Sequence, residues 1–235
     1  RIDEPWLKVI GGVFPMKRIL SVTEERFALA AAFTISRGSK TEAAVLTCMI
    51  EQDGHVGRGE CVPYARYGET IESVRAEIEL MSGDIANGMS RHQLLAAMKP
   101  GAARNAIDCA LWDLEAKISG IRVFTHLGVT TPRPVETAYT IPLGEPEAMA
   151  AQARKHSGRP LLKVKVGTAD DTSRIEAVTA SAPQSRIILD ANEGWNEENL
   201  AAHLNIAARC GVALIEQPLP AGQDEALRTV NRSVP

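Results

Sequence analysis

Short hydrophobic runs alternate with amphipathic segments through the second half of the chain. Val135–Ile141, Leu161–Gly167, Arg186–Asn192 and Gly211–Pro218 are short and apolar, which predicts strands. The segments between them are rich in Ala and Glu or have apolar residues three and four positions apart, which predicts helices over 146–155, 171–181 and 197–210. Repeated strand and helix units of this length indicate parallel strands with helices outside the sheet.

Polar residues stand near the ends of these predicted strands at a regular interval. The steps from Thr140 to Lys165, from Lys165 to Asp190 and from Asp190 to Glu216 are 25, 25 and 26 residues. In a β/α barrel, polar residues at the carboxyl ends of strands form the active-site face. We therefore expect Thr140, Lys163, Lys165, Asp190 and Glu216 to face one mouth.

The two lysines of the strand 161–167 allow two interpretations. Residues two apart share a face of a strand, so Lys163 and Lys165 point the same way. Neighbouring ammonium groups repel each other and are costly to desolvate, so this face can be the solvated side of an edge strand. The carboxylates that end the next two strands favour a site instead.

The first half of the chain has a different pattern. Ile19–Val22, Phe27–Ile35, Ala43–Glu51 and Val56–Cys61 predict a meander of three or four antiparallel strands, with Asp53-Gly54 as a turn. Helices are predicted over 70–81, 90–98 and 101–118, the last ended by Gly120.

The polar stretch Phe33–Thr41 predicts a loop, and Arg37 within it is either a solvated loop residue or a substrate contact.

These patterns predict an α+β domain followed by part of a β/α barrel. Residues 1–15 are interpreted as an extension upstream of Met16, residues 16–130 as the α+β domain and residues 131–235 as the barrel segment, with Thr130–Pro134 as the linker. An eight-fold barrel takes about 250 residues. The segment after the linker has room for roughly four βα units, so we expect an incomplete barrel.

Composition narrows the class of protein. The chain is 45% hydrophobic and 23% charged, with a net charge of −3, which argues against a nucleic-acid partner. It has no apolar run long enough to span a membrane. Four scattered cysteines indicate reduced thiols and a cytoplasmic protein. The five histidines show no metal-binding spacing.

Asp190 and Glu216 are hard oxygen ligands suited to Mg²⁺. The alternative is a buried ion network in which both carboxylates pair with Lys163 and Lys165. A metal that binds a substrate carboxylate, next to a lysine with a lowered pKa, would allow removal of the proton beside that carboxylate.

Three motifs resemble the enolase superfamily and its muconate-lactonising-enzyme subgroup. They are the K-x-K of Lys163 and Lys165, the D-A-N that begins at Asp190 and the E-Q-P that begins at Glu216. Superfamily sites use a Lys or His base with Mg²⁺. Other stretches resemble the L-Ala-D/L-Glu (dipeptide) epimerases within the subgroup, namely 35–39, 59–64, 103–113, 136–140 and 216–220.

The resemblance implies a role for each motif residue. Lys165 is the general base, while Lys163 contacts the substrate carboxylate and lowers the pKa of Lys165. Asp190 and Glu216 bind Mg²⁺. The loop residue and the first strand also receive roles, since Arg37 would hold the side-chain carboxylate of a glutamate and Thr140 would contact substrate.

The implied activity is Mg²⁺-dependent epimerisation of dipeptides such as L-Ala-D/L-Glu in cell-wall peptide recycling. The implied fold is a capping domain before an enolase-type barrel. The family's third metal carboxylate and second catalytic lysine come from later strands, so we expect this chain to be an N-terminal part that is inactive when made alone.

Other interpretations stay open. The chain could have another activity of the subgroup, as a cycloisomerase or an o-succinylbenzoate synthase, or it could be a non-catalytic fragment on the same scaffold. We expect a small-molecule dipeptide as partner and leave homo-oligomerisation open.

Overall fold

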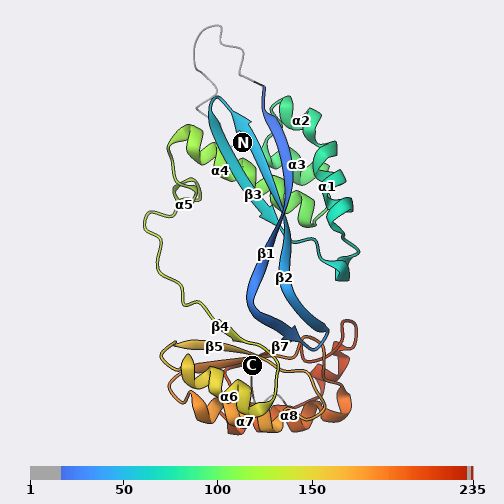
Figure 1. The fold of residues 1–235 in the computed structure, drawn as a ribbon, viewed down its shortest axis with the longest axis vertical. Helices are drawn as coiled ribbons and strands as arrows, with labels where there is room; N and C mark the ends of the chain where they lie inside the picture. Colours follow the sequence, from blue (N-terminus) through green and yellow to red (C-terminus); the bar gives the residue numbers. More distant parts are fainter. Residues whose placement is uncertain (1–16, 232–233, 235) are drawn as a thin grey trace. The chain divides into compact units, whose positions relative to one another are not determined.

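An antiparallel sheet of three strands begins the fold in the computed structural model, which describes residues 17–231 and 234. The strands are β1 (Ile19–Ile35), β2 (Gly38–Gln52) and β3 (His55–Cys61), in that order across the sheet (Figure 1). Asp53 and Gly54 join β2 to β3 with φ angles of 51° and 77°, as a tight hairpin turn requires. The predicted meander is confirmed, and the interpretation of residues 1–15 lies outside the described residues.

The first hairpin corrects two predictions. The segments 19–22 and 27–35 form one continuous strand, and the loop predicted over Phe33–Thr41 is only a turn at Ser36 and Arg37. Both predictions were wrong because the residues between positions 26 and 42 are exposed or half-buried. A ribbon without a buried face does not need alternating apolar and polar residues, so its sequence resembles that of a loop.

Five helices accompany this sheet. Thr70 and Ser90 begin two of them with capping boxes, and Gly120 ends the longest with a φ of 69°. The three predicted helices are confirmed to within two residues, whereas the short α2 was not predicted. The helices are α1 (Ile71–Leu80), α2 (Ser82–Ala86), α3 (Arg91–Ala97), α4 (Ala102–Ser119) and α5 (Val123–His126), and a 3-10 turn, η1 (Ala65–Tyr67), precedes them.

Helix α4 packs directly on β3 because two glycines of that strand lack side chains. A Cβ on Gly57 would lie 2.1 Å from the carbonyl oxygen of Ala110, and one on Gly59 would lie 2.0 Å from that of Ala106. The backbones of helix and strand therefore approach more closely than any side chain allows. Around this contact lies an apolar core that includes Leu46, Ile50, Val74, Ile78, Leu94, Ile107, Leu111 and Leu114.

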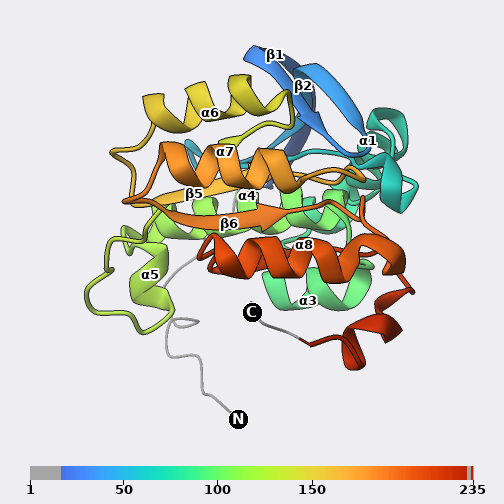
Figure 2. The ribbon, with the colours of Figure 1, turned by 90° about the horizontal axis from the view of Figure 1, so that it is seen from below.

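Strands and helices alternate regularly after the linker. The elements are β4 (Tyr139–Ile141), α6 (Pro146–Lys155), β5 (Leu161–Lys165), α7 (Thr172–Ser181), β6 (Arg186–Asp190), α8 (Glu197–Arg209) and β7 (Leu214–Glu216), with η2 (Asp224–Arg228) after them. The four strands are parallel and lie in sequence order. Helices α6, α7 and α8 run alongside one another on one side of the sheet (Figures 1 and 2). The predicted fold class is confirmed.

Alternate residues of β5 and β6 face these helices. Leu162, Val164, Ile187 and Leu189 are at most 4% exposed and belong to one apolar core with residues of the three helices. The period of two then turns Lys163, Lys165 and Asp190 to the other face of the sheet. The hydrophobic pattern that builds the core thus also fixes the direction of the polar residues.

Contacts divide the chain into two compact units, and each unit is made of two separate segments. The first comprises residues up to Phe27 together with Ala43–Pro132, and the second comprises Ala28–Glu42 with Arg133–Pro235. The end of the β1–β2 hairpin thus belongs to the barrel unit. The predicted boundaries, 16–130 and 131–235, stay a prediction.

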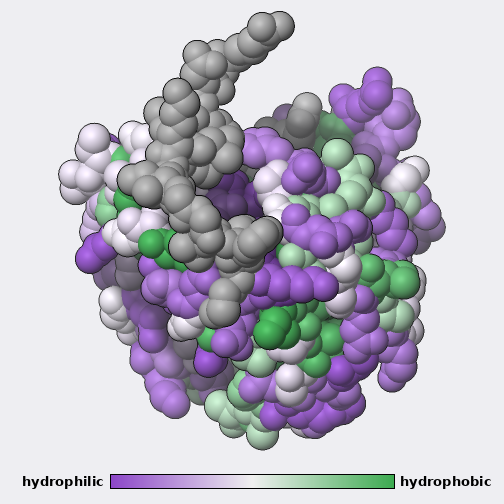
Figure 3. All heavy atoms as spheres, turned by 90° about the horizontal axis from the view of Figure 1, so that it is seen from above, coloured by the Kyte–Doolittle hydropathy of each residue, from purple (hydrophilic) through white to green (hydrophobic). Residues whose placement is uncertain are grey.

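None of the helices in the described residues is both long enough and apolar enough to span a bilayer. On the face drawn in Figure 3, hydrophilic residues are interspersed with smaller groups of hydrophobic ones.

Candidate active site

Strand register brings the polar strand residues together. Thr140 lies beside Lys163 in the sheet, and Lys165, Asp190 and Glu216 lie side by side across β5, β6 and β7. Residues side by side on parallel strands share a face, and so do residues two apart on one strand. All five side chains therefore project from the same face, opposite to helices α6–α8.

Four of these side chains form one ion network. The Nζ atom of Lys163 lies 2.5 Å from Oε2 of Glu216 and 2.9 Å from Oδ2 of Asp190. Lys165 Nζ lies 2.6 Å from the same Asp190 oxygen. The Asp190 side chain is 1% exposed, that of Lys165 is 9% exposed and that of Glu216 is 42% exposed, so the network runs from the interior to the surface.

The network keeps Asp190 and Lys163 charged. Burial raises the pKa of Asp190, but hydrogen bonds from Lys165, Lys163 and the Asn192 backbone outweigh burial and hold that pKa below its usual value. Burial lowers the pKa of Lys163, but hydrogen bonds to Glu216 and Asp190 outweigh it, so the pKa of Lys163 is raised. At neutral pH the Lys163 ammonium thus lies beside the Asp190 carboxylate.

Arg37 lies at the turn of the β1–β2 hairpin, within the barrel unit. Its Nη1 donates to the backbone oxygen of Asn192 at 2.6 Å and lies 3.2 Å from Oε2 of Glu193. Ser36 donates to the same Asn192 oxygen at 2.8 Å. On the same hairpin, the ring of Phe33 has its centroid 5.8 Å from Lys165 Nζ. The hairpin turn thus contacts the loop that follows Asp190.

Sequence reasoning gave no role to the residues just after the two carboxylates. Asn192 Oδ1 accepts from Lys165 Nζ at 2.9 Å, and Asn192 Nδ2 donates to Gln217 Oε1 at 3.3 Å. Asn192, Glu193 and Gln217 have φ angles of 47°, 68° and 45°, a region that costs energy for residues other than glycine. Such backbone strain is typical of functional sites, and an Asn just after a strand end was the available signal.

Two sequence models match most of the chain. One is described as the mandelate racemase/muconate lactonizing enzyme N-terminal domain and matches residues 17–128. The other is described as enolase C-terminal domain-like and matches residues 147–235. The L-Ala-D/L-Glu epimerase of Escherichia coli (strain K12) is 41% identical over 93% of this chain and 68% of its own length. The chain belongs to the mandelate racemase/muconate lactonizing enzyme family.

Other proteins similar to this chain are two of known structure and a racemase. An enolase family member from Agrobacterium tumefaciens, described as having homology to dipeptide epimerases and solved with sodium and L-Ala-L-Glu, has a TM-score of 0.91 and 55% identity. A dipeptide epimerase from Cytophaga hutchinsonii, complexed with Mg and D-Ala-L-Val, has a TM-score of 0.83 and 26% identity. An N-acetyl-D-glutamate racemase from Pseudoalteromonas is 36% identical over 81% of this chain.

This chain covers about two thirds or less of the family members that it matches. It spans 68% of the Escherichia coli epimerase and 61% of the racemase. The match with the Agrobacterium chain covers 92% of this chain and 67% of that one. The match with the Cytophaga chain covers 94% of this chain and 64% of that one. The resemblance to the enolase superfamily that the motifs predicted is confirmed.

The carboxylates of the network are ligands of the type that binds Mg²⁺. Asp190 and Glu216 are carboxylates at adjacent strand ends, and they already hold one cation between them, the ammonium of Lys163. Mg²⁺ in proteins is often bound by one or two carboxylates, with waters or substrate completing its coordination. Within the described residues, no cluster of three or more His, Cys, Asp or Glu side chains suited to a metal is found.

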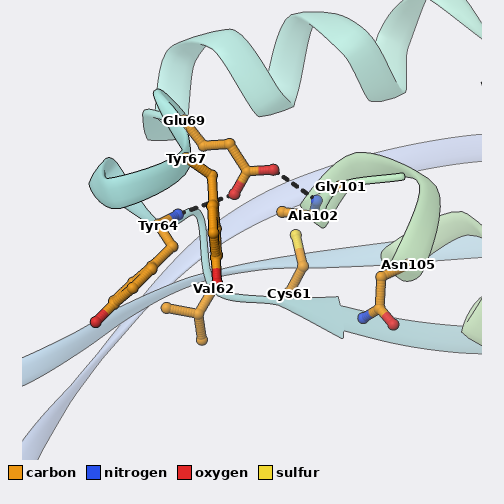
Figure 4. A pocket seen from close by; sticks show the side chains of 8 residues that line it. All are labelled: Cys61, Val62, Tyr64, Tyr67, Glu69, Gly101, Ala102 and Asn105. Carbon is orange, nitrogen blue, oxygen red and sulfur yellow. Dashed lines mark hydrogen bonds between the residues drawn. The ribbon is translucent and has the colours of Figure 1, made fainter. Parts of the chain in front are cut away.

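The first unit contains a hollow that is lined by none of the predicted site residues. Its volume is about 260 Å³ (Figure 4). Glu69 crosses it, because its two carboxylate oxygens accept from the backbone N–H of Tyr64 at 3.0 Å and of Ala102 at 2.7 Å. Ala102 begins α4, so Glu69 supplies an anion at the start of that helix. The hollow is lined by Cys61, Val62, Tyr64, Tyr67, Glu69, Gly101, Ala102 and Asn105.

Proposed function

We propose that this chain carries one side of the active site of a Mg²⁺-dependent dipeptide epimerase, with L-Ala-D/L-Glu as its type of substrate. The observation that supports the proposal most is the network of Lys163, Lys165, Asp190 and Glu216 on a single sheet face. Two amines and two carboxylates are the groups needed to bind a substrate carboxylate and to remove the proton next to it.

Lys165 is the proposed base. Its amine is nearly buried and is held by Asp190 Oδ2 and Asn192 Oδ1, which fix its direction. A base held in one place can take an α-proton to Nζ without first losing freedom of motion, which is the advantage of a positioned catalytic group. Thr140, beside Lys163 in the sheet, is proposed to contact the substrate on the same face.

Lys163 and the two carboxylates form the proposed binding end of the site. Mg²⁺ held by Asp190 and Glu216 would supply positive charge for the substrate carboxylate and for the negative charge that develops on it. Lys163 now neutralises these two carboxylates. If Asp190 and Glu216 bound the metal, the Lys163 ammonium would be available to the substrate carboxylate.

Arg37 is proposed to select the second residue of the dipeptide. Its guanidinium already has a carboxylate partner, Glu193, and this pairing supports a role in binding an acidic group. The glutamate side chain of an Ala-Glu dipeptide is such a group. Arginine binds carboxylates through paired donors, so this contact favours an acidic residue over an apolar one.

The proposed setting is the recycling of cell-wall peptides in the cytoplasm, which supply Ala-Glu dipeptides. Racemisation of an N-acylated glutamate is a second candidate, because an Ala-Glu dipeptide is itself an N-acylated glutamate and a racemase of that class is 36% identical. A cycloisomerase or an o-succinylbenzoate synthase stays open as well, and so does a non-catalytic protein on the same scaffold.

The test uses the protein that carries this chain, purified with Mg²⁺ and compared with an EDTA-treated sample. L-Ala-L-Glu, L-Ala-L-Leu and N-acetyl-D-glutamate are followed by polarimetry, and α-proton exchange is followed by NMR in D₂O. We expect inversion of L-Ala-L-Glu, with slower inversion of the other two compounds. Binding of the dipeptide without α-proton exchange would identify a non-catalytic protein, and faster turnover of N-acetyl-D-glutamate would identify the racemase.

A further inference from the structure

Asp171 is a fully buried carboxylate that accepts four hydrogen bonds. Its Oδ2 accepts from the backbone N–H of Gly167 at 2.7 Å, that of Thr168 at 2.9 Å and the indole Nε1 of Trp195 at 2.7 Å. Its Oδ1 accepts from the Thr168 hydroxyl at 2.8 Å, and Arg174 lies 3.5 Å from it. Asp171 is 0% exposed, and a carboxyl group at such depth needs hydrogen-bond partners.

The place of Asp171 in the fold does not explain these contacts. It is the residue before α7, where an Asp side chain usually accepts from the first N–H groups of its own helix. Within the described chain, the Asp171 side chain makes no such capping bond. It points instead to the loop that precedes it and to Trp195. The carboxylate is therefore used to join two loops and not to start a helix.

The two loops are those that carry the proposed chemistry. Gly167 follows the base Lys165 by two residues, and Trp195 follows Asp190 in the loop between β6 and α8. Asp171 and the indole thus connect the carboxyl end of β5 with that of β6. Val166 adds a second link, because its N–H donates to the backbone oxygen of Asp190 at 3.0 Å.

The backbones of these two loops are in close contact. A Cβ on Gly167, whose φ is 123°, would lie 2.4 Å from the carbonyl oxygen of Ala191. A Cβ on Gly194 would lie 2.4 Å from the carbonyl oxygen of Gly167. Two loops in backbone contact and joined by a buried carboxylate can shift only together, so the distance between their side chains is fixed.

We propose that Asp171 is a positioning residue which, through Gly167, Thr168 and Trp195, sets the place of the Lys165 amine relative to Asp190. This role rests on the proposed function of Lys165 as the base. Asp171 touches neither of these two groups. It acts through the backbone that leaves β5 and through the indole that follows β6.

Three variants separate positioning from plain stability. Trp195→Phe removes one donor and keeps the ring that stacks on His203. Asp171→Leu removes all the acceptors, whereas Asp171→Asn keeps one oxygen for the three donors that meet Oδ2. The control is Ser185→Ala, which removes a 2.7 Å hydrogen bond to the Arg159 backbone just before β6, at the amino ends of the strands.

The first readout needs no enzymatic activity. Trace acetylation of Lys165, measured by mass spectrometry of its peptide, is compared with that of the exposed Lys99 in the same sample. We expect the ratio to change about tenfold in Trp195→Phe and more in Asp171→Leu, to stay near the wild-type value in Asp171→Asn, and not to change in Ser185→Ala. An unchanged ratio in a folded Trp195→Phe overturns the proposal, even if Asp171→Leu fails to fold.

The second readout is catalytic. A small displacement of a catalytic group can cost about a hundredfold in rate. We expect Trp195→Phe to lower kcat for L-Ala-L-Glu by at least about tenfold with little change in KM, and Ser185→Ala to change neither. Wild-type protein without epimerase activity would refute the proposed function, while the acetylation ratios would still decide whether Asp171 positions Lys165.

Discussion

Nη1 of Arg37 lies 3.2 Å from Oε2 of Glu193, so the arginine predicted to bind a glutamate of the substrate is already paired with a glutamate of the chain. The two residues come from the hairpin turn and from the loop after Asp190, and both belong to the barrel unit. On the role proposed for Arg37, the Glu193 carboxylate occupies the place of the substrate carboxylate.

This pairing makes a prediction about specificity. Arg37→Ala should lower kcat/KM for L-Ala-L-Glu by roughly ten- to a hundredfold, since a charge-assisted hydrogen bond contributes about 1.5–3 kcal/mol, and should affect L-Ala-L-Leu much less. The control is Arg209→Ala, because Arg209 forms an exposed pair with Glu176 at 3.5 Å. Equal losses on both dipeptides would make Arg37 a plain turn residue.

Removal of the proposed base should abolish turnover and preserve the fold. Loss of a general base lowers rates by roughly 10²–10⁴-fold, and Lys165→Ala should lie at the upper end because carbon acids are weak. Circular dichroism reports the fold, and α-proton exchange in D₂O reports the chemistry. Lys117→Ala, which removes an exposed pair with Asp113, should leave exchange at the wild-type rate. Near-normal exchange in Lys165→Ala would exclude Lys165 as the base.

The two carboxylates should determine the Mg²⁺ concentration that activity requires. Asp190→Asn and Glu216→Gln each remove one negative charge from the network, so activity should be lost first at low Mg²⁺ and should recover partly at high Mg²⁺. Titration calorimetry with Mg²⁺ measures the affinity directly. Glu136→Gln, which breaks an exposed pair with Arg186, should leave the titration unchanged. If EDTA-treated wild-type protein keeps full activity, neither carboxylate has the proposed role.

His203 should make the protein less stable in acid. It is 2% exposed, and its ring stacks on Trp195. Burial lowers its pKa, which Asp171 and the Thr168 backbone oppose only in part. Below the ordinary value of 6.5, the unfolded chain takes up a proton at His203 that the folded chain does not, so the free energy of unfolding falls as the pH falls.

The comparison that isolates this effect is with His203→Phe, which keeps a stacked ring and cannot titrate. Urea unfolding should show that the wild type loses stability relative to the variant as the pH falls from about 7 towards 5. The two proteins should have parallel pH dependence above pH 7. Parallel curves over the whole range would show that His203 is accessible to protons in the folded state.

The contact between β3 and α4 predicts that one methyl group added at Gly59 strongly lowers the stability of the fold. Gly59→Ala places a Cβ 2.0 Å from the Ala106 carbonyl oxygen, so the strand and helix must separate. Overpacking typically costs about 1–3 kcal/mol of stability, and contact with rigid backbone should reach or exceed that range. Gly83→Ala in α2 is the control, because its Cβ would meet no described atom within 4 Å. Thermal unfolding of the two variants measures the difference.

The barrel segment was predictable because one pattern specifies both its core and its site. In β5, Leu162 and Val164 must face the helices, and this leaves Lys163 and Lys165 on the other side. The regular interval between strand ends then places Asp190 and Glu216 beside them. Local periodicity and chain length contain this information, so no knowledge of distant contacts was required.

Features that depend on separate loops were not predictable. The positive φ angles at Asn192 and Gln217 result from two loops that bond to each other, as Glu193 N–H does to the Gln217 carbonyl at 2.7 Å. Asp171 stands at the start of the predicted helix 171–181, and only the position of Trp195 shows that its side chain joins two loops. The end of the β1–β2 hairpin, residues 26–42, lacks a buried face, so the sequence there did not show where β1 ends and β2 begins.

The discontinuous barrel unit has a consequence for gene fusion. Ala28–Glu42 belongs to that unit, although it is encoded long before the linker at Thr130–Pro134. A chimera of two relatives joined at the linker would take the turn with Ser36 and Arg37 from one parent and the loop with Asn192 and Glu193 from the other. On the proposed roles, such a chimera inherits its choice of dipeptide from the first parent and its chemistry from the second.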